Sequence, residues 1–524
     1  MRRMILICLL WMITNLATAA LPDQFAQRLA KGSLTEKQQL ISEMIKENDA
    51  SIQPLFTALV EGNLYWLDTN STLAIKQDNQ FINWRNKQVI DLPKNQFKRI
   101  TINNNIRQLV AQYQLQIKLS SNTIPTRRNA AKALFGHIQS PSQINIIVER
   151  LALEQDSEVK QRLLEALAFA KLENCQQNEC LVLLTQLSNV TNPIFVQKLQ
   201  QMTSIEGSPI VKEKAQSLLD KLTQKQAMYE KTEQVYFGIS LGAVLVLAAI
   251  GLAITFGVMG VINMAHGELI MIGAYTTYVM QQLLPNYPGI ALILSVPAAF
   301  LVCGAVGMLI EISVIKYLYG RPLETLLATF GISLLLQQLF RTLFSPLNKA
   351  IITPSWMQGS IQVNDFLSLT INRLYVIGFS LTIFIVLLLI MKKTSLGLNV
   401  RAISMNPLMA RCLGVKASWV NALTFGLGSG IAGLAGVALS QITNVGPNLG
   451  QNYIIDSFMV VVFGGVGNLW GTLIAGLTLG LANKFLEPIT GAMLAKIMVL
   501  ISLVLFIQKR PRGLFPQRGR AVEG

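Results

Sequence analysis

Long uncharged runs dominate the second half of this sequence. Residues 234–267, 269–310 and 417–455 contain no Asp, Glu, Lys or Arg. A helix needs about 20 mostly apolar residues to cross the hydrocarbon core of a bilayer, and each of these runs is long enough. Polar backbone groups in lipid must be bonded within the protein, so spanning segments of this kind are helical. The second half is therefore predicted to be an all-α polytopic membrane domain.

Charged side chains are spread unevenly along the chain. Residues 1–234 carry 48 of the charged side chains and residues 235–524 carry 24. We therefore place a transmembrane domain over 235–508 and a basic cytoplasmic tail over 509–524. The net charge of +16 is typical of some nucleic-acid-binding proteins. In the membrane half, however, Lys and Arg gather in short loops and at the C-terminus, so no nucleic-acid partner is expected.

Apolar stretches divide the membrane domain into nine segments. They cover residues 236–258, 268–284, 289–312, 322–344, 374–391, 418–440, 454–466, 470–484 and 490–508. The seventh and eighth are short and could be half-helices, which gives eight to nine membrane segments. With alternating direction, twelve Lys and Arg fall on one side and at most four on the other. The positive-inside rule places the twelve in the cytoplasm and residue 235 outside.

The N-terminus has the three parts of a secretory signal. MRRMILICLLWMITNLATAALPD combines two arginines, an apolar run and Ala17-Thr18-Ala19. We predict a signal peptide over 1–19, cleaved near Ala19 or Ala20; an uncleaved anchor is the alternative. In either case residues 20–233 are expected in the bacterial periplasm, with the multi-pass domain in the inner membrane.

The exported region divides near residue 120. Within 52–118, the run NLYWLDTNSTLAIKQDNQFINWRNKQVIDL alternates over short stretches broken by Asp-Asn and Arg-Asn. That pattern predicts β-hairpins, and hence a small β-rich part over 20–120.

Residues 121–233 follow a helical pattern with an internal repeat. RNAAKALFG (128–136) aligns with KQRLLEALA (160–168) at a spacing of 33 residues, and VKEKAQSLLDKL (211–222) is a looser third copy. Repeats of this length resemble HEAT-like helical pairs, which bury a core only by stacking. They could form a docking surface or serve as a spacer.

Two cysteines lie in the exported region once the signal is removed. Cys175 and Cys180, in CQQNEC, could form a disulfide in an oxidising compartment if a turn brings them together. Two unpaired thiols are the alternative. The remaining cysteines show no metal-ligand spacing, so no metal is expected.

Three polar residues interrupt the apolar stretch FGVMGVINMAHGELIMIGAY. Asn263, His266 and Glu268 fall within six residues of one another. Buried polar groups in a membrane are costly unless they are paired or hydrated, and broken helices are tolerated where they line a cavity. We expect an irregular segment here that forms a pathway, a gate or a structural contact between subunits. Asn444 and Asn468 are further pathway candidates.

Nucleotide and hydrolase motifs do not account for this chain. GLGSGIAGLAG (426–436) satisfies GxGxxG, but no strand precedes it, and small residues four apart, such as Gly426 and Gly430, favour close helix packing. The sequence has no GxxxxGK[ST] loop and only two histidines. We therefore expect no catalytic residues and no cofactor.

The longest basic loop carries a candidate docking helix. In KKTSLGLNVRAISMNPLMARCLGVKASW (392–419), Asn406 can cap a short helix that begins at Pro407. The apolar contacts available are Val400, Ile403, Leu408 and Leu413. Such a helix lies either on the membrane lipid or in a groove of a partner protein.

These motifs resemble a known family. Residues 251–275 look like the signature of permease subunits of the branched-chain amino acid and amide family of ABC importers. Residues 401–415 are similar to that family's cytoplasmic loop, in the order Arg401, Ala402, Asn406, Ala410 and Gly414. VVFGGVGNLWGTLIAG (461–476), the tail KRPRGLFPQRGR (509–520), and a signal peptide followed by an exported repeat domain resemble the urea-type permease.

The resemblance implies a division of labour between subunits. This chain would pair with a second related permease to form a pathway for urea or short amides. Two cytoplasmic ATPases would bind the ATP, a periplasmic binding protein would deliver the solute, and the loop 400–416 would couple to the ATPases. A passive urea channel or a secondary transporter is the alternative, and a membrane-anchored sensor is a third possibility.

Overall fold

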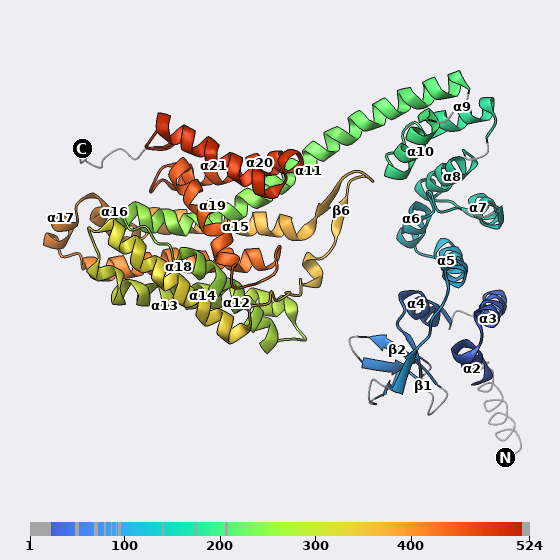
Figure 1. The fold of residues 1–524 in the computed structure, drawn as a ribbon, viewed down its shortest axis with the longest axis horizontal. Coiled ribbons are helices and arrows are strands. Elements are labelled where there is room, and N and C mark those ends of the chain that lie inside the picture. Colours follow the sequence, from blue (N-terminus) through green and yellow to red (C-terminus); the bar gives the residue numbers. More distant parts are fainter. Residues whose placement is uncertain are drawn as a thin grey trace, which may run out of the picture. The chain divides into compact units, whose positions relative to one another are not determined.

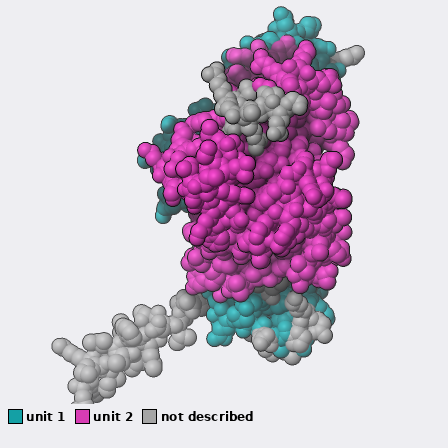
Figure 2. Space-filling model, turned by 90° about the vertical axis from the view of Figure 1, so that its left-hand side faces the viewer, with its two compact units in different colours: residues 1–190, 194–219 teal, residues 191–193, 220–524 magenta. Residues whose placement is uncertain are grey.

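The computed structural model describes residues 23–47, 52–67, 72–77, 80–84, 86–90, 92, 96–138, 141–172, 175–204 and 208–515. Figure 2 colours two compact units: unit 1 covers residues 1–190 and 194–219, and unit 2 covers 191–193 and 220–524. The expected signal peptide and the last residues of the basic tail lie outside the described residues.

Unit 1 begins with helices followed by a small sheet (Figure 1). The helices are α2 (Asp23–Lys31), α3 (Leu34–Glu47) and α4 (Gln53–Glu61), and α5 (Asn104–Leu119) follows the sheet. The strands are β1 (Leu64–Leu67), β2 (Thr72–Gln77), β3 (Gln80–Asn83), β4 (Val89–Ile90) and β5 (Phe97–Arg99). Their order is β4-β3-β2-β1-β5, and every neighbouring pair is antiparallel.

The predicted β-hairpins are confirmed, but they occupy a shorter stretch than 52–118. The two ends of that stretch form α4 and α5 instead. Leu55, Phe56 and Leu59 recur at helical spacing, and all three are buried in one core with Val110 and Tyr113 of α5. Helical periodicity at the edges of the stretch therefore prevails over strand alternation at its centre.

The rest of unit 1 is built from paired helices. These are α6 (Ile124–Ala133), α7 (Pro141–Leu153), α8 (Ser157–Lys171), α9 (Gln177–Gln186) and α10 (Pro193–Ser204), followed by the start of α11 (Pro209–Met259). α6 and α8 begin 33 residues apart, as the repeat alignment requires. A disulfide joins Cys175 to Cys180 before and within α9, with Cα atoms 5.3 Å apart.

The third copy of the repeat was aligned with the wrong helix. Phe135, which follows α6, packs on Phe169 of α8 with ring centroids 4.6 Å apart, and Phe169 packs on Phe195 of α10 at 6.4 Å. α10 therefore continues the series of α6 and α8. Residues 211–222 lie in α11, the second helix of the third pair. An amphipathic pattern is shared by both helices of a pair, which explains the misalignment.

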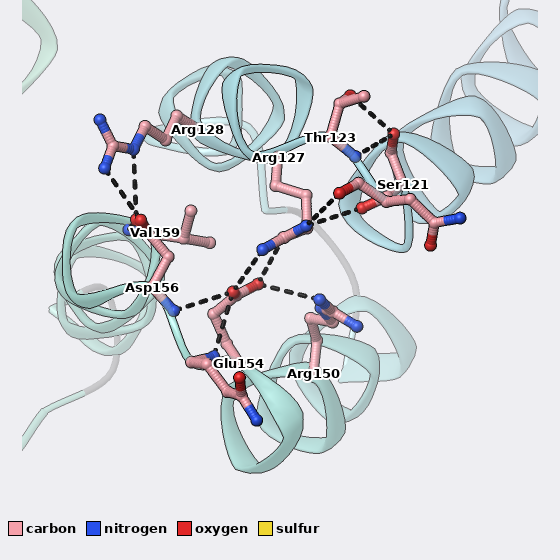
Figure 3. A network of polar contacts seen from close by, with 10 residues as sticks. Ser121, Thr123, Arg127, Arg128, Arg150, Glu154, Asp156 and Val159 are labelled. Carbon is pink, nitrogen blue, oxygen red and sulfur yellow. Dashed lines mark hydrogen bonds and ion pairs between the residues drawn. The ribbon is translucent and has the colours of Figure 1, made fainter.

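A buried carboxylate joins the two helices of the first pair of unit 1, α6 and α7 (Figure 3). Glu154 follows α7 and its side chain is 1% exposed. It accepts hydrogen bonds from Arg127 of α6 at 3.0 and 3.1 Å, and from Arg150 of α7 at 2.9 Å. Burial by itself would raise the pKa of Glu154, but the bonds from Arg127, the backbone N–H of Asp156 and Arg150 outweigh it and lower that pKa.

We predict that Glu154→Gln destabilises unit 1 by about 3 kcal/mol, because two guanidinium groups lose their shared charged partner in a buried site. The matched control is Glu158→Gln, whose side chain is 48% exposed and pairs with Arg128 at the surface; its expected cost is below about 1 kcal/mol. Amide hydrogen exchange of α6 and α8 in the full chain measures both. Equal exchange in the two variants would contradict the prediction.

Acidification should weaken the same contact. The pKa of Glu154 is lower in the folded chain than in the unfolded chain, so its stabilising contribution is present above the ordinary carboxyl pKa and is lost as the pH falls through the folded value. The free energy of opening of α6 and α8, obtained from exchange rates corrected for the pH dependence of intrinsic amide exchange, should therefore stay constant near neutral pH and fall in acid. Glu154→Gln should show a smaller fall.

The described part of unit 2 is helical apart from one short hairpin. Its elements are the rest of α11, α12 (His266–Leu283), α13 (Pro288–Ser313), η3 (Ile315–Tyr317), α14 (Pro322–Phe344), η4 (Ser355–Met357), β6 (Ser360–Gln362), β7 (Ser368–Thr370), α15 (Ile371–Lys393), α16 (Ser395–Met405), α17 (Pro407–Cys412), α18 (Ala417–Ser440), α19 (Leu449–Gly464), α20 (Leu469–Thr490) and α21 (Ala492–Lys509). β6 and β7 pair antiparallel.

Seven of the described helices are long and apolar enough to cross a membrane. They are α11, α13 with η3, α14, α15, α18, α20 and α21. The predicted count was eight to nine, and the difference lies in α12 and α19. α19 has only 16 residues, and α12 carries His266, Glu268 and two glutamines near its ends. Both pack inside the unit, α12 against α13 and α18, and α19 against α12 and α20.

Glycine contacts set the spacing of the central helices. A Cβ on Gly428 would lie 2.7 Å from the carbonyl oxygen of Gly251 in α11. A Cβ on Gly430 would lie 2.7 Å from the ring of Phe300 in α13, and one on Gly433 would lie 2.8 Å from the carbonyl oxygen of Ala299. The GxGxxG run is therefore a helix-packing surface, as interpreted from the sequence.

The basic loops gather at one end of unit 2, which we call the basic end. Val261, after α11, packs with Ile315 of η3. Val258 packs with Val400 of α16, and Phe515 of the tail hydrogen-bonds the carbonyl oxygen of Gly464, before α20. The described cations of these loops and the tail are Lys316, Arg321, Lys392, Lys393, Arg401, Arg411, Lys416, Lys509, Arg510 and Arg512. β6 and β7 lie at the opposite end (Figure 1).

Candidate functional site: a buried polar track along α14

Helix α14 has a polar buried side and an apolar exposed side. Its buried residues are Thr325, Thr329, Ser333 and Gln337, each four positions after the last. Its exposed residues are mostly apolar, with Glu324, Gln338 and Thr342 as the polar exceptions. The large apolar ones are Leu323, Leu327, Phe330, Leu334, Leu335, Leu339 and Leu343. Residues four apart share one face of a helix, so this arrangement reverses that of a water-soluble helix. We call Thr325, Thr329, Ser333, Gln337 and Arg341 the polar track.

The half of the track nearer the basic end bonds to the irregular segment between α11 and α12. Thr329 Oγ1 accepts a hydrogen bond from the backbone N–H of Met264 at 3.1 Å. The same hydroxyl lies 2.8 Å from the carbonyl oxygen of Thr325, to which it donates. The side chain of Asn263 accepts from the backbone N–H of Ala265 at 3.0 Å, and Asn263 is 1% exposed. The bond from Met264 to Thr329 holds the segment, which the sequence predicted to be irregular, against α14.

The middle of the track contains a buried carboxylate. Ser333 donates a hydrogen bond to Glu268 Oε1 at 3.0 Å, and Glu268 is 1% exposed. Glu268 Oε2 and Asn263 Nδ2 are both buried and have no hydrogen-bond partner among the described residues. A buried polar atom without a partner costs free energy, and such atoms are candidates for contact with water or a solute.

The end of the track nearer β6 and β7 is a cluster of amides with one guanidinium. Gln337 donates to Asn448 Oδ1 at 3.0 Å, and Arg341 donates to the same oxygen at 2.7 Å. Gln451 of α19 donates to Gln337 Oε1 at 3.4 Å. The track therefore runs the length of α14 and contacts α12 and α19, and its side chains offer hydroxyl and amide groups that both donate and accept.

The other predicted pathway residues lie off the track. His266 is fully buried, and its Nε2 is 2.8 Å from the carbonyl oxygen of Ala248 in α11. Asn444 is exposed in the turn before α19. Asn468 Oδ1 accepts from the backbone N–H groups of Trp470 and Gly471, so it is the N-cap of α20. Of the five candidates, the structure brings only Asn263 and Glu268 to α14.

Sequence reasoning missed the track itself. Its signal was present, because hydroxyl, amide and guanidinium residues recur every fourth position from Thr325 to Arg341 in an otherwise apolar segment. A count of charged residues and apolar runs does not reveal that pattern, because Arg341 is its only charged member. Partners such as Asn448 and Gln451 are more than 100 positions away and are brought close only by packing.

The basic end presents a separate surface, formed by α16 and α17. Asn406 Oδ1 accepts from the backbone N–H of Met409 at 2.9 Å, which confirms the predicted cap of the helix that begins at Pro407. Ala410 is buried, while Ala402 is half-buried. Gly414 ends the segment with a φ of +85°, a conformation that favours glycine.

The apolar side chains of this segment divide into two groups. Val400 and Ile403 pack with Met391 at the end of α15 and so fix α16 to the membrane helices. The second group is exposed: Met405 by 78%, Leu408 by 73%, Met409 by 58% and Leu413 by 78%. We call these four the apolar ridge. An exposed apolar group of this kind is typical of a surface that binds another protein.

A polytopic helical unit with a polar track in its interior has the makeup of a membrane permease. Residues 234–507 match the family described as "Branched-chain amino acid transport system / permease component". This match covers more than half of the 524 residues, and the chain belongs to this family. It is the permease component of an ABC importer of the branched-chain amino acid type, and not an enzyme.

Curated relatives agree with the family match. The chain is 29% identical over 300 residues to the high-affinity branched-chain amino acid transport system permease protein BraD of Pseudomonas aeruginosa, covering 55% of this chain and 96% of BraD. It is 28% identical over 292 residues to the LivH permease protein of Escherichia coli K12, covering 54% and 94%. No solved structure matches. Unit 1 ends at residue 219, before the family match begins at residue 234.

Proposed function

We propose that this chain carries urea or another short neutral amide across the inner membrane. It would form the pathway with a second related permease, receive solute from a periplasmic binding protein and be driven by two ATPases at the basic end. The observation that carries the choice of solute is the buried side of α14, whose members between Thr325 and Gln337 are uncharged hydrogen-bonding groups. An amide needs donors and acceptors and no ion pair.

Two further observations support this solute. The runs 461–476 and 509–520, and an N-terminal domain preceding the permease, resemble the urea-type member of the family. The two unpartnered atoms beside the track, Asn263 Nδ2 and Glu268 Oε2, are one donor and one acceptor. Such a pair complements the C=O and N–H groups of one small amide.

The track is closed by its own hydrogen bonds, so transport requires it to open. Ser333 would separate from Glu268, and Gln337 from Asn448, as α14 moves away from α12 and α19. Each bond lost could be replaced by one to the solute or to water, which keeps the cost of opening low. His266, Asn444 and Asn468, which lie off the track, would keep structural roles.

Branched-chain amino acids are the second candidate solutes. They are named in the descriptions of BraD and LivH. Glu268 and Arg341 also place a carboxylate and a guanidinium along the polar track. There they could bind the ammonium and the carboxylate of a zwitterion. Uptake of labelled urea and of labelled leucine by cells that express the complete importer separates the two candidates.

Coupling to the ATPases is tested on the apolar ridge. Leu408→Glu should lower accumulation of labelled urea at least ~10-fold, because a charge in an apolar docking surface must be desolvated for binding. The ATPases should also be lost when the complex is purified. Since Leu408 is exposed, the variant chain should reach the membrane in normal amounts.

The matched control is Leu347→Glu, at the opposite end of unit 2, where the side chain is 69% exposed. This variant should retain the ATPases. If Leu408→Glu and wild type equilibrate urea equally without accumulating it, the passive channel replaces the ATP-driven permease. If both accumulate urea equally, α17 is not the coupling element.

A further inference from the structure

A cavity of about 250 Å³ opens at the basic end. It lies between the end of α11, the end of α15, α16 and the start of α20. Its walls are largely apolar and come from spanning helices, with Ile254, Val258, Leu388 and Leu469 among them. The polar track does not contribute to it, and the apolar ridge lies outside it.

Two cations line this cavity. Lys392 is at the end of α15, and Arg401 is on α16. Arg401 Nη1 donates to the carbonyl oxygen of Met391 at 3.0 Å, which fixes the guanidinium and leaves its other N–H groups available. Within residues 208–515, neither Lys392 nor Arg401 forms an ion pair, whereas the exposed Glu324 is paired with Arg321. The positive charge at the cavity is therefore not neutralised by this part of the chain.

The charge comes from side chains and not from a helix end. The first N–H groups of α20 are already bonded to the side chain of Asn468. Trp470 lines the cavity, is 52% exposed and packs edge-on against Phe384 at 5.5 Å. Tryptophan is enriched at the level of lipid headgroups. The cavity is thus lined by an apolar wall, an interfacial aromatic ring and two cations that form no ion pair within residues 208–515.

We propose that this cavity binds the phosphate headgroup of an anionic membrane lipid such as phosphatidylglycerol. The phosphate would lie between Lys392 and Arg401, and the glycerol and upper acyl chain would lie against Ile254, Leu388 and Trp470. Basic pockets between spanning helices on the cytoplasmic side are suited to anionic headgroups. A free phosphate ion would use the two cations but leave the apolar wall exposed to water.

The bound lipid would also act on α16. It bridges the end of α15 to Arg401, one turn before the cap of α17 at Asn406. The lipid would therefore hold the docking segment in position and make ATPase coupling sensitive to the anionic lipid content. This proposal does not depend on the solute, since lipid binding is measured without transport.

The test is photo-crosslinking of the purified importer in phosphatidylcholine vesicles containing photoactivatable phosphatidylglycerol. The charge-removing variant is Lys392→Gln with Arg401→Gln. Its control, Lys393→Gln with Arg411→Gln, removes the same charge from the same end but outside the cavity. A headgroup contact with each cation contributes roughly 1 kcal/mol, so the first variant should lower the apparent affinity for phosphatidylglycerol about tenfold or more. The control should change it less than about twofold.

Several outcomes would overturn the proposal. Equal loss in the two double variants would show diffuse attraction to the whole basic end. Displacement by inorganic phosphate at modest concentration would show a free-anion site, and equally strong labelling by photoactivatable phosphatidylcholine would show no headgroup recognition. The exchange Lys392→Arg with Arg401→Lys keeps both charges and should retain lipid, which distinguishes loss of charge from loss of fold.

Discussion

Replacing Gln337 with leucine should abolish most transport, with solute uptake reduced at least ~10-fold while the chain remains in the membrane. The leucine removes the bonds from Gln337 to Asn448 at 3.0 Å and from Gln451 at 3.4 Å. It also inserts an apolar side chain into the polar track, where a passing solute would lose a donor and an acceptor at once. Asn448 keeps its bond from Arg341, so the local fold should persist.

The neighbouring residue supplies the matched control. Gln338 has the same side chain but is exposed on the apolar side of α14. Gln338→Leu makes that side more uniformly apolar and should leave uptake unchanged. Initial rates of labelled urea and leucine uptake, corrected for the amount of chain in the membrane, measure both variants. Normal uptake by Gln337→Leu, or equal loss in both, would show that the track is not the pathway.

The track is a candidate pathway because α14 buries its polar side and exposes its apolar side. The sequence reveals this arrangement in part. A four-residue spacing of Thr325, Thr329, Ser333 and Gln337 predicts one polar face. Whether that face meets lipid, a second subunit or the interior depends on tertiary packing. The bond from Ser333 to Glu268 joins residues 65 positions apart, and no local pattern specifies it.

The polar stretch that contains Asn263, His266 and Glu268 shows the same limit. The sequence predicted an irregular segment around Asn263, and the structure places residues 260–265 between α11 and α12. Asn263 and Glu268 lie beside α14, but His266 bonds to α11 instead. His266 and Glu268 are only two positions apart at the start of a helix, so they point to different neighbours. Spacing within a motif therefore did not show which of its members share a site.

Helix boundaries were predicted well where hydropathy and turns agree. The segment 418–440 corresponds to α18 and 322–344 to α14, each bounded by loop residues. The number of membrane crossings was harder to predict from the sequence. α12 and α19 are short or interrupted by polar residues, and they are stabilised by packing against neighbouring helices. In unit 1, the alignment of residues 211–222 failed because both helices of a pair have the same amphipathic pattern.

Placing valine at Gly273 should remove most of the folded protein from the membrane. A Cβ at Gly273 of α12 would lie 2.1 Å from the carbonyl oxygen of Gly433 in α18 and 2.5 Å from its Cα. Both atoms belong to backbone, so no flexible side chain can move aside and the two helices must separate. α18 is the most buried of the seven long apolar helices, and we expect a cost above about 3 kcal/mol, at the upper end for overpacked cores.

Gly378→Val isolates this close approach from the general effect of adding a β-branched residue. Gly378 lies within α15, and a Cβ there would meet no atom within 4 Å. The amount of chain in the membrane and the thermal aggregation of the solubilised protein should match wild type for Gly378→Val and fall sharply for Gly273→Val. Equal abundance of the two variants would mean that α12 and α18 can separate without loss of the fold. Gly273→Ala should already show an intermediate loss, because the first added carbon makes the contact with the Gly433 backbone.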